Sequence, residues 1–228
     1  SVDSSGLEGN DYSGRPFPSA QGRIVAFESA ADDLVPDDTN GMIDVFVHDR
    51  VTGETSRVSM DSWGGQGNGD SRVPVVSADG TTVVFASWAD NLVPDDTNGM
   101  ADVFVHDRST GETLRVSISS QGEQGNGDVF FHVPSPYSVS ADGTTVVFAS
   151  LADNLVPDDT NGMADVFVHD RSTGATSRVS VDSAGTQGNG HSALASLSGD
   201  GRIVAFASSA DNLVPDDTNG MTDVFVHD

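Results

Sequence analysis

Four loops of this chain carry carboxylates and amides at a spacing that suits a hard cation. Each loop has the sequence Asp-Thr-Asn-Gly-Met-x-Asp, so oxygen side chains stand at its first, third and seventh positions around a glycine. Ca²⁺ prefers such flexible oxygen ligands, and we predict about one ion per repeat. The predicted ligands are Asp38, Asn40 and Asp44; Asp96, Asn98 and Asp102; Asp159, Asn161 and Asp165; and Asp217, Asn219 and Asp223.

The same loop sequence also describes a metal-free turn, because Asp and Asn side chains accept hydrogen bonds from nearby backbone N–H groups. The crowding of carboxylates in a chain without lysine favours the cation, since unpaired like charges repel. Three arginines, Arg57, Arg115 and Arg178, come after the loops at a constant distance, and we expect them to pair with carboxylates of the same repeat.

Other residues that could take part in catalysis or metal binding give a weaker indication of a functional site. His48, His106, His169 and His227 recur beside aspartates, and we expect them to be hydrogen-bonded parts of the framework rather than a metal or acid–base pair. The chain has no Cys, no Lys and no G-x-S-x-G motif, and its paired carboxylates recur in every repeat. We therefore predict that it is not an enzyme.

The third repeat carries five extra residues that include an aromatic cluster. We predict a ligand-binding surface there, formed by Phe130, Phe131, His132 and Tyr137, which would contact a sugar ring or a protein partner. The alternative is that these residues pack inside the fold.

The elements that must position these residues are indicated by a repeated phrase. PDDTNG-Met-x-DVFVHD begins at residues 36, 94, 157 and 215, so the spacing is 58, 63 and 58 residues. A fixed period of this size indicates a repeat architecture. We predict one domain over residues 1–228, with repeat units at approximately 1–58, 59–116, 117–179 and 180–228.

Each unit contains four short apolar segments separated by turns. In the second unit these are residues 81–87, 102–107, 114–117 and the stretch 133–140 that leads into the next unit. They are rich in β-branched and aromatic residues, which predicts strands. Four antiparallel strands per unit are typical of β-propeller blades, whereas a parallel β-helix has a much shorter period. We predict an all-β fold, a propeller of four tandem four-stranded blades.

The phrases SADGTTVVFAS, NLVPDDTNG and DVFVHDRSTGET resemble the PD40 or TolB-like (WD40-like) propeller repeats of secreted bacterial proteins. The resemblance covers essentially the whole chain and implies a binding or scaffold module. The PDDTNG insert is similar to the calcium loops of FG-GAP propellers and DxDxDG proteins, with Met at the fifth position instead of Asp.

The two ends of the chain are offset from the repeat boundaries. Residues 1–3 align with residues 180–182, at the end of a unit's outer strand. We expect the N-terminal strand to complete the last blade, either within one chain or by self-association with another copy as a dimer or open fibre. A slice of a longer array is the remaining alternative.

The amino-acid composition narrows the range of possible functions further. The net charge is −25, from 35 acids against 10 bases, which argues against a nucleic-acid partner. No apolar run is long enough for a membrane span. We predict a non-enzymatic, Ca²⁺-stabilised structural, assembly or interaction module that is extracellular or on the cell surface. The alternative is a lectin-like carbohydrate- or protein-binding propeller that uses the aromatic insertion.

Overall fold

The computed structural model of the chain describes residues 1–129 and 137–228, and these residues form strands, turns and loops without any helix. In particular, they include no helix of the length and apolarity needed to cross a membrane. The strands are β1 (Ser13–Pro18), β2 (Ile24–Ser29), β3 (Asp44–Asp49), β4 (Thr55–Arg57), β5 (Ser71–Val76), β6 (Thr82–Ser87), β7 (Asp102–Asp107), β8 (Glu112–Arg115), β9 (Tyr137–Val139), β10 (Thr145–Ser150), β11 (Asp165–Asp170), β12 (Ala175–Arg178), β13 (Ser192–Leu197), β14 (Val204–Ser208) and β15 (Asp223–His227).

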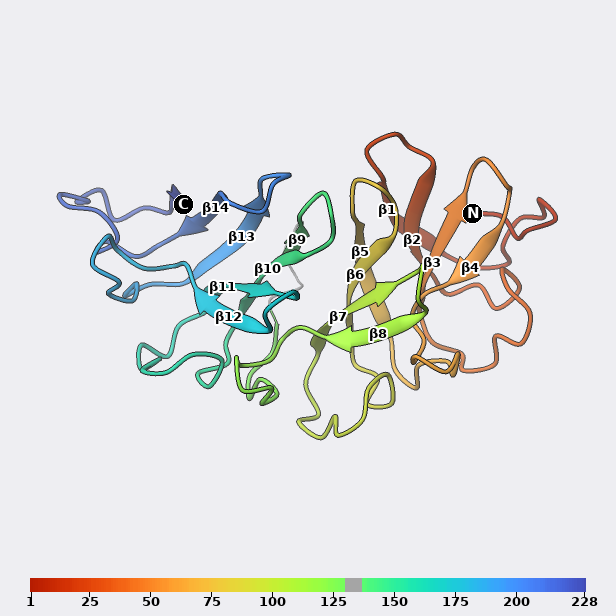
Figure 1. Cartoon of the computed structure of the whole chain (residues 1–228), viewed down its shortest axis with the longest axis horizontal. Coiled ribbons are helices and arrows are strands. Elements are labelled where there is room, and N and C mark those ends of the chain that lie inside the picture. Colours follow the sequence, from red (N-terminus) through yellow and green to blue (C-terminus); the bar gives the residue numbers. More distant parts are fainter. Residues whose placement is uncertain (130–136) are drawn as a thin grey trace. The chain divides into compact units, whose positions relative to one another are not determined.

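The strands form four antiparallel sheets, each built from strands that are consecutive in the chain (Figure 1). Their orders are β1-β2-β3-β4, β5-β6-β7-β8, β9-β10-β11-β12 and β13-β14-β15. One sheet thus falls in each predicted repeat unit. The all-β prediction is confirmed, and the arrangement is consistent with the blades of a β-propeller.

The prediction that the N-terminal strand completes the last blade is wrong for this structure. Among the described residues the fourth sheet has three strands, and none of the sheets is closed. The N-terminal segment lies against β4 instead, where Thr55 Oγ1 donates a hydrogen bond to the Val2 carbonyl (2.6 Å). The N-terminal segment forms hydrogen bonds with the outer strand β4 of the first sheet, so it does not pair with the fourth sheet.

A serine completes the contact between the N-terminal segment and β4. The backbone N–H of Thr55 donates to Ser4 Oγ (3.0 Å), and Ser4 Oγ also lies 3.3 Å from the Thr55 carbonyl. The same arrangement recurs where Ser62 meets Thr113. The segment before a sheet therefore docks on the outer strand of that sheet, and the N-terminal residues obey this rule.

The second and third strands of each sheet pair in full register, and in the first three sheets they are largely apolar and buried. Phe85 on β6 stands opposite Phe104 on β7, with ring centroids 6.0 Å apart, and both rings are fully buried. The other sheets repeat this stacked pair. Burial on both faces is what sheets stacked face to face require.

The chain divides into two compact units, Ser1–Arg115 and Val116–Asp228, each with two sheets. In the first unit, Ala26, Val45 and Val47 of the first sheet join Val83 and Phe85 of the second in one buried cluster. We call the sheet surface that carries Ala26, Val45 and Val47, and the equivalent surface of the other sheets, the forward face. The opposite surface, which carries Val83 and Phe85 in the second sheet, is the rear face.

The second unit repeats this packing. Val147 and Val166, on the forward face of the third sheet, share a buried cluster with Val204 and Phe206, on the rear face of the fourth. Forward face against rear face is therefore the way in which consecutive sheets pack within each unit. The prediction of a single domain is not tested by this division.

A glycine allows the segment that leads into β13 to lie against the end of β14 in the same sheet. A Cβ on Gly190 would stand 2.6 Å from the carbonyl carbon of Ser209, so the backbone would have to shift. We expect Gly190→Ala to lower the free energy of unfolding by about 1–3 kcal/mol, as overpacking does. Gly199→Ala is the matched control, because the nearest atom to its Cβ would be 3.8 Å away. Urea denaturation measures both, and equal losses would contradict the packing explanation.

Candidate functional site: the aspartate–arginine loops

Each predicted loop connects the second and third strands of its sheet and begins with a tight turn. The aspartate before the loop has a positive φ, for example 58° at Asp37 and 58° at Asp158, a left-handed conformation that Asp tolerates better than most residues. Next, Asn40 accepts a hydrogen bond at Oδ1 from the Met42 N–H (2.9 Å). This turn brings the first and last aspartates of the loop close together.

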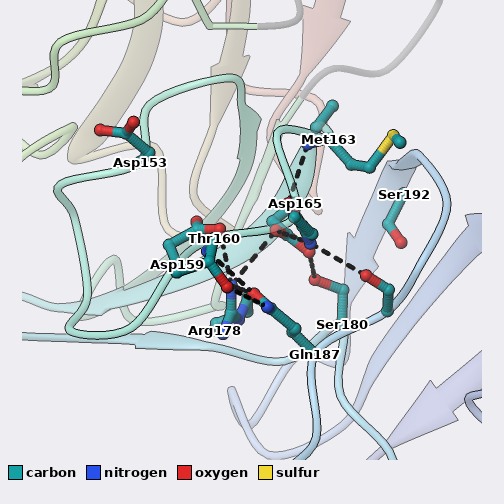
Figure 2. Close-up of polar contacts among 12 residues, drawn as sticks. Asp153, Asp159, Thr160, Met163, Asp165, Arg178, Ser180, Gln187 and Ser192 are labelled. Carbon is teal, nitrogen blue, oxygen red and sulfur yellow. Dashed lines mark hydrogen bonds and ion pairs between the residues drawn. The ribbon is translucent and has the colours of Figure 1, made fainter.

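An arginine from the outer strand lies between these two aspartates. In the third loop, Arg178 Nη1 is 2.9 Å from Asp159 Oδ1 and 3.4 Å from Asp165 Oδ2 (Figure 2). All three side chains are nearly or fully buried, at 9%, 3% and 0% exposure. The guanidinium is thus the internal counterion of two buried carboxylates, and the cluster keeps one net negative charge.

The remaining side-chain oxygens of the third loop also accept hydrogen bonds. Ser180 Oγ donates to Asp165 Oδ1, and Asn161 Nδ2 donates to Asp165 Oδ2 (2.9 Å). The other end of the amide is fixed as well, because Asn161 Oδ1 accepts the Met163 N–H (2.8 Å). The amide oxygen of Asn161 therefore faces the backbone, away from Asp165.

A glutamine from the segment that leads to the next sheet closes the cluster. Gln187 Oε1 accepts a hydrogen bond from Arg178 Nη1 (3.0 Å), and its Nε2 donates to Thr160 Oγ1 (2.7 Å). Figure 2 shows these side chains converging on Arg178, whereas Asp153 lies apart from them. The cluster thereby ties a loop, an outer strand and an intersheet segment together.

The first two loops repeat this geometry. Arg57 Nη1 is 3.0 Å from Asp38 and 3.4 Å from Asp44, and Arg115 Nη1 is 2.9 Å from Asp96 and 3.3 Å from Asp102. The prediction that these arginines pair with carboxylates of their own repeat is confirmed. Asn98 Nδ2 likewise donates to Asp102 Oδ2 (2.9 Å).

This arrangement does not fit a calcium ion in the first three loops. The guanidinium stands between the two carboxylates, and the asparagine presents its N–H₂ to the last of them. Across residues 1–129 and 137–228, no group of three or more His, Asp or Glu side chains is arranged to hold a metal. The calcium prediction itself is not tested and stays a prediction.

The fourth loop differs from the others. Asn219 Nδ2 still donates to Asp223 Oδ2 (2.9 Å), and Met221 N–H still bonds to Asn219 Oδ1 (2.6 Å). In the described part of the chain, however, no arginine pairs with Asp217 or Asp223. Both carboxylates are partly exposed. This loop keeps two negative charges where the others have one.

Burial and mutual repulsion act on the carboxylates of the first three loops. The pKa of Asp159 is raised chiefly by burial and then by the neighbouring Asp165, with Arg178 opposing the shift. The pKa values of Asp38, Asp44 and Asp96 are also raised, chiefly by burial. One arginine therefore does not offset the whole cost of burying two carboxylates.

Three of the recurring histidines, His48, His106 and His169, are hydrogen-bonded parts of the framework, as predicted. His106 Nδ1 is 2.9 Å from Thr113 Oγ1, and this hydroxyl donates to the Met60 carbonyl (2.5 Å), so the histidine must be the donor to the threonine. His169 makes the same contact with Thr176. Burial lowers the pKa of both histidines.

The predicted aromatic ligand surface is only partly within the described residues. Phe130, Phe131 and His132 lie outside them, so their part of the prediction stays open. Tyr137 lies on β9 opposite Phe148 and is 1% exposed. Its ring is therefore part of the core, which matches the packing alternative and not a surface contact.

A buried glutamate that breaks the repeat was missed from the sequence. Glu28 is 2% exposed and stands where the other sheets have Ala86, Ala149 and Ala207. It accepts hydrogen bonds from the Val73 N–H (2.8 Å) and, at 3.3 Å, from the hydroxyl of Tyr12. The signal that could have revealed it was a single charge inside an otherwise apolar strand.

The structure is similar to solved propeller proteins, although no protein-family model and no curated protein matches the chain. TolB from Acinetobacter baumannii superposes with a TM-score of 0.51 and 18% identity, over 95% of this chain and 44% of that one. The β-propeller domain of the Trilobed protease from Pyrococcus furiosus, described as having an open velcro topology, gives 0.52 and 9%, over 96% and 55%. These similarities support a TolB-like propeller fold.

The expectation that the chain is not an enzyme is contradicted by a further similarity. Oligogalacturonate lyase from Vibrio parahaemolyticus has a TM-score of 0.53 and 12% identity, over 90% of this chain and 49% of the lyase. The fold therefore occurs in enzymes, and its repetitive character does not exclude catalysis. At this identity the similarity shows the fold alone. The chain spans about half the length of these proteins.

Removal of the arginine tests its role as counterion. We expect Arg178→Met to lower the free energy of unfolding by about 3–5 kcal/mol, because it leaves two buried carboxylates without a cation. Adding Asp159→Asn should recover part of this loss, since it removes one of the two charges. Arg202→Met is the control, because Arg202 is exposed. Guanidinium denaturation measures all three, and equal losses for Arg178→Met and Arg202→Met would contradict the role.

The buried histidines predict a pH dependence. Their folded-state pKa lies below the unfolded value of 6.5, so the unfolded chain takes up protons first as the pH falls. Their contribution to stability is complete above pH 6.5 and is lost as the pH falls through the folded pKa. We expect the melting temperature to decrease between about pH 7 and pH 5, and the slope to flatten in a His106→Gln, His169→Gln variant. Parallel pH curves for the two proteins would refute this assignment.

Proposed function

We propose that this chain is an interaction module of propeller blades that joins further blades of the same kind through two open apolar faces, with a second copy as the partner. The fold similarity to TolB supports the coarser part, a propeller interaction module. One observation supports the finer part. The faces left open in the first and fourth sheets are the same two kinds that pack together inside each unit.

The open forward face belongs to β15. Val224 and Val226 are 77% and 69% exposed, whereas their equivalents on β3, Val45 and Val47, are completely buried against the next sheet. The two valines are neighbours on one face of the strand, and contiguous exposed apolar surface on a soluble protein can mark an interaction site. The fourth sheet thus offers a surface suited to another rear face.

The rear face of the first sheet is open only in part: Val25 is half-buried, and Phe27 is 7% exposed. A cavity of about 430 Å³ lies over β2 and is lined by Val25, Phe27, Pro16, His48 and Val2. In the second sheet the equivalents of Val25 and Phe27, which are Val83 and Phe85, are fully buried. A forward face from a second copy would fill this cavity, as Val45 and Val47 cover the rear face of the second sheet.

We place this assembly outside the cell, on the basis of the large acid excess and the absence of cysteine. Calcium stabilisation of the assembly remains a prediction, and the fourth loop is the place for it because no arginine pairs with its carboxylates in the described residues. Binding of a glycan or protein through Phe130, Phe131 and His132 also stays a prediction.

Light scattering across a concentration series tests the proposal. The wild-type mass should rise above the 23.6 kDa of a single chain by about 100 µM, where an interface of micromolar Kd is occupied. Val224→Thr with Val226→Thr should keep the chain monomeric, because it removes the apolar forward face. The control is Val51→Thr with Leu114→Thr, which changes exposed apolar residues elsewhere.

Two different results would each refute a part of this proposal. A wild-type chain that stays at the monomer mass over the whole series would refute self-association. Association that both double variants preserve would refute the forward face as its site. Repeating the series in CaCl₂ and in EDTA tests the calcium prediction separately.

A further inference from the structure

A histidine takes the place of an aspartate at one of the contacts between consecutive sheets. In the first unit, the Ile43 N–H donates a hydrogen bond to Asp70 Oδ1 (2.9 Å), just before β5. In the second unit, the Ala164 N–H donates to His191 Nδ1 (2.9 Å), just before β13. We call these contacts the first joint and the third joint, after the loops that they follow. Asp128 holds the same sequence position in the remaining repeat.

The backbone of the two joints is arranged alike. The Ser71 N–H donates to the Ile43 carbonyl (2.7 Å), and the Ser192 N–H donates to the Ala164 carbonyl (2.8 Å). Each joint therefore connects the residue before a loop's last aspartate to the start of the next sheet by two hydrogen bonds. The joints differ in the acceptor side chain, which is a carboxylate in the first and an imidazole in the third.

An imidazole accepts this hydrogen bond in only one protonation state. Because Nδ1 of His191 receives the Ala164 N–H, this nitrogen carries a lone pair, and the proton of the neutral ring is on Nε2. A protonated imidazole has two N–H donors and no acceptor. Histidine is the residue type that gains its proton between about pH 8 and pH 5, whereas aspartate stays an acceptor over this range.

The position of His191 allows protonation in the folded chain. Its side chain is exposed. This exposure belongs to the position in the fold, because the Asp70 side chain is 34% exposed in a complete four-stranded sheet. Ala164, in contrast, is completely buried, so its N–H has no water to bond to when the imidazole stops accepting. A buried backbone donor without a partner destabilises the arrangement that contains it.

The charged groups on the elements packed against His191 are few. The third loop carries Asp159 and Asp165, which share the guanidinium of Arg178. The loop after β14 carries Asp211, whose carboxylate accepts a hydrogen bond from a neighbouring asparagine (2.6 Å). In the part of the chain that the structure describes, none of these carboxylates forms an ion pair with the His191 ring. The third joint therefore depends on the lone pair of Nδ1 and not on a fixed charge pair.

We propose that the third joint is a pH-sensitive switch between the third loop and the fourth sheet. At neutral pH the bond from the Ala164 N–H to His191 keeps the joint closed. In acid the protonated ring turns away from this N–H, and the loop separates locally from the segment before β13. The buried cluster that contains Val166 and Phe206 keeps the two sheets packed. The first joint stays closed because Asp70 still accepts. The switch acts within one chain and does not rest on the proposed self-association.

Residue-resolved hydrogen exchange of the whole chain tests the switch, with protection factors measured by NMR at about pH 8 and pH 5. We expect the protection of the Ala164 amide to fall about 10- to 100-fold on acidification, as the loss of the bond to a buried donor implies. The Ile43 amide is the internal control. Its protection should change no more than that of a core amide such as Val105, which is completely buried.

Exchanging the acceptors between the joints gives two matched variants. His191→Asp should keep the Ala164 amide protected at both pH values, and Asp70→His should transfer the pH dependence to the Ile43 amide. Each variant tests the switch if the other fails to fold. Unchanged protection of Ala164 on acidification of the wild-type chain would overturn the proposal, and so would the wild-type fall in His191→Asp.

Nitrogen NMR of the His191 ring gives an independent readout. At neutral pH the proton should be on Nε2, and a proton on Nδ1 would overturn the proposal. The buried His106 and His169 act on the stability of the whole chain, so they lower the protection of all core amides together. The ratio of Ala164 to Ile43 protection therefore separates the switch from that effect, and neither result depends on whether the chain associates.

Discussion

A buried guanidinium between two carboxylates is the interaction on which each complete sheet depends. Arg178 comes from the outer strand β12, Asp159 and Asp165 from the loop between β10 and β11, and Gln187 from the segment leading to the next sheet. Three parts of the chain are thereby held in one geometry by polar contacts. Because the charges are desolvated, no partner can be removed cheaply.

This constraint also connects neighbouring sheets. The segment between the first and second sheets carries Gln66. Its Gly67 carbonyl accepts a hydrogen bond from the Asn40 amide (3.0 Å), and its Asp70 carboxylate accepts one from the Ile43 N–H (2.9 Å). The next inner strand therefore starts from a fixed position beside the preceding loop. Forward and rear faces can then meet in one register, as the buried clusters of both units show.

Within the described residues, the fourth sheet has no outer strand, no guanidinium beside its loop and no following sheet against its forward face. Its loop keeps the turn made by Asn219 and Met221, so the local hydrogen bonds do not need the arginine. Its last strand, however, exposes valines that are buried elsewhere, and its carboxylates are left without a cation in the described residues. The open edge and the excess charge occur together because a single outer strand satisfies both in the other sheets.

Local pattern and period determined most of the fold. The spacing of the repeated phrase marked the four sheets, and runs of β-branched and aromatic residues marked strands such as β6 and β7, because burial on both faces demands those side chains. The pairing of Arg57, Arg115 and Arg178 was also accessible, since their distance from the loops spans one hairpin. The non-enzyme prediction failed because a repeat pattern describes a scaffold and says nothing of what the scaffold carries.

Only the tertiary structure decided what the loops do with their oxygens. Asp38, Asn40 and Asp44 have the composition of a calcium loop, but the distance of Arg57 from both carboxylates and the direction of the Asn40 amide emerge only when the strands are paired. The burial of Tyr137 and the placement of the N-terminal segment against β4 were decided in the same way. Each depends on contacts between residues distant in the chain, and a single sequence encodes such contacts only through the energy of the assembled fold.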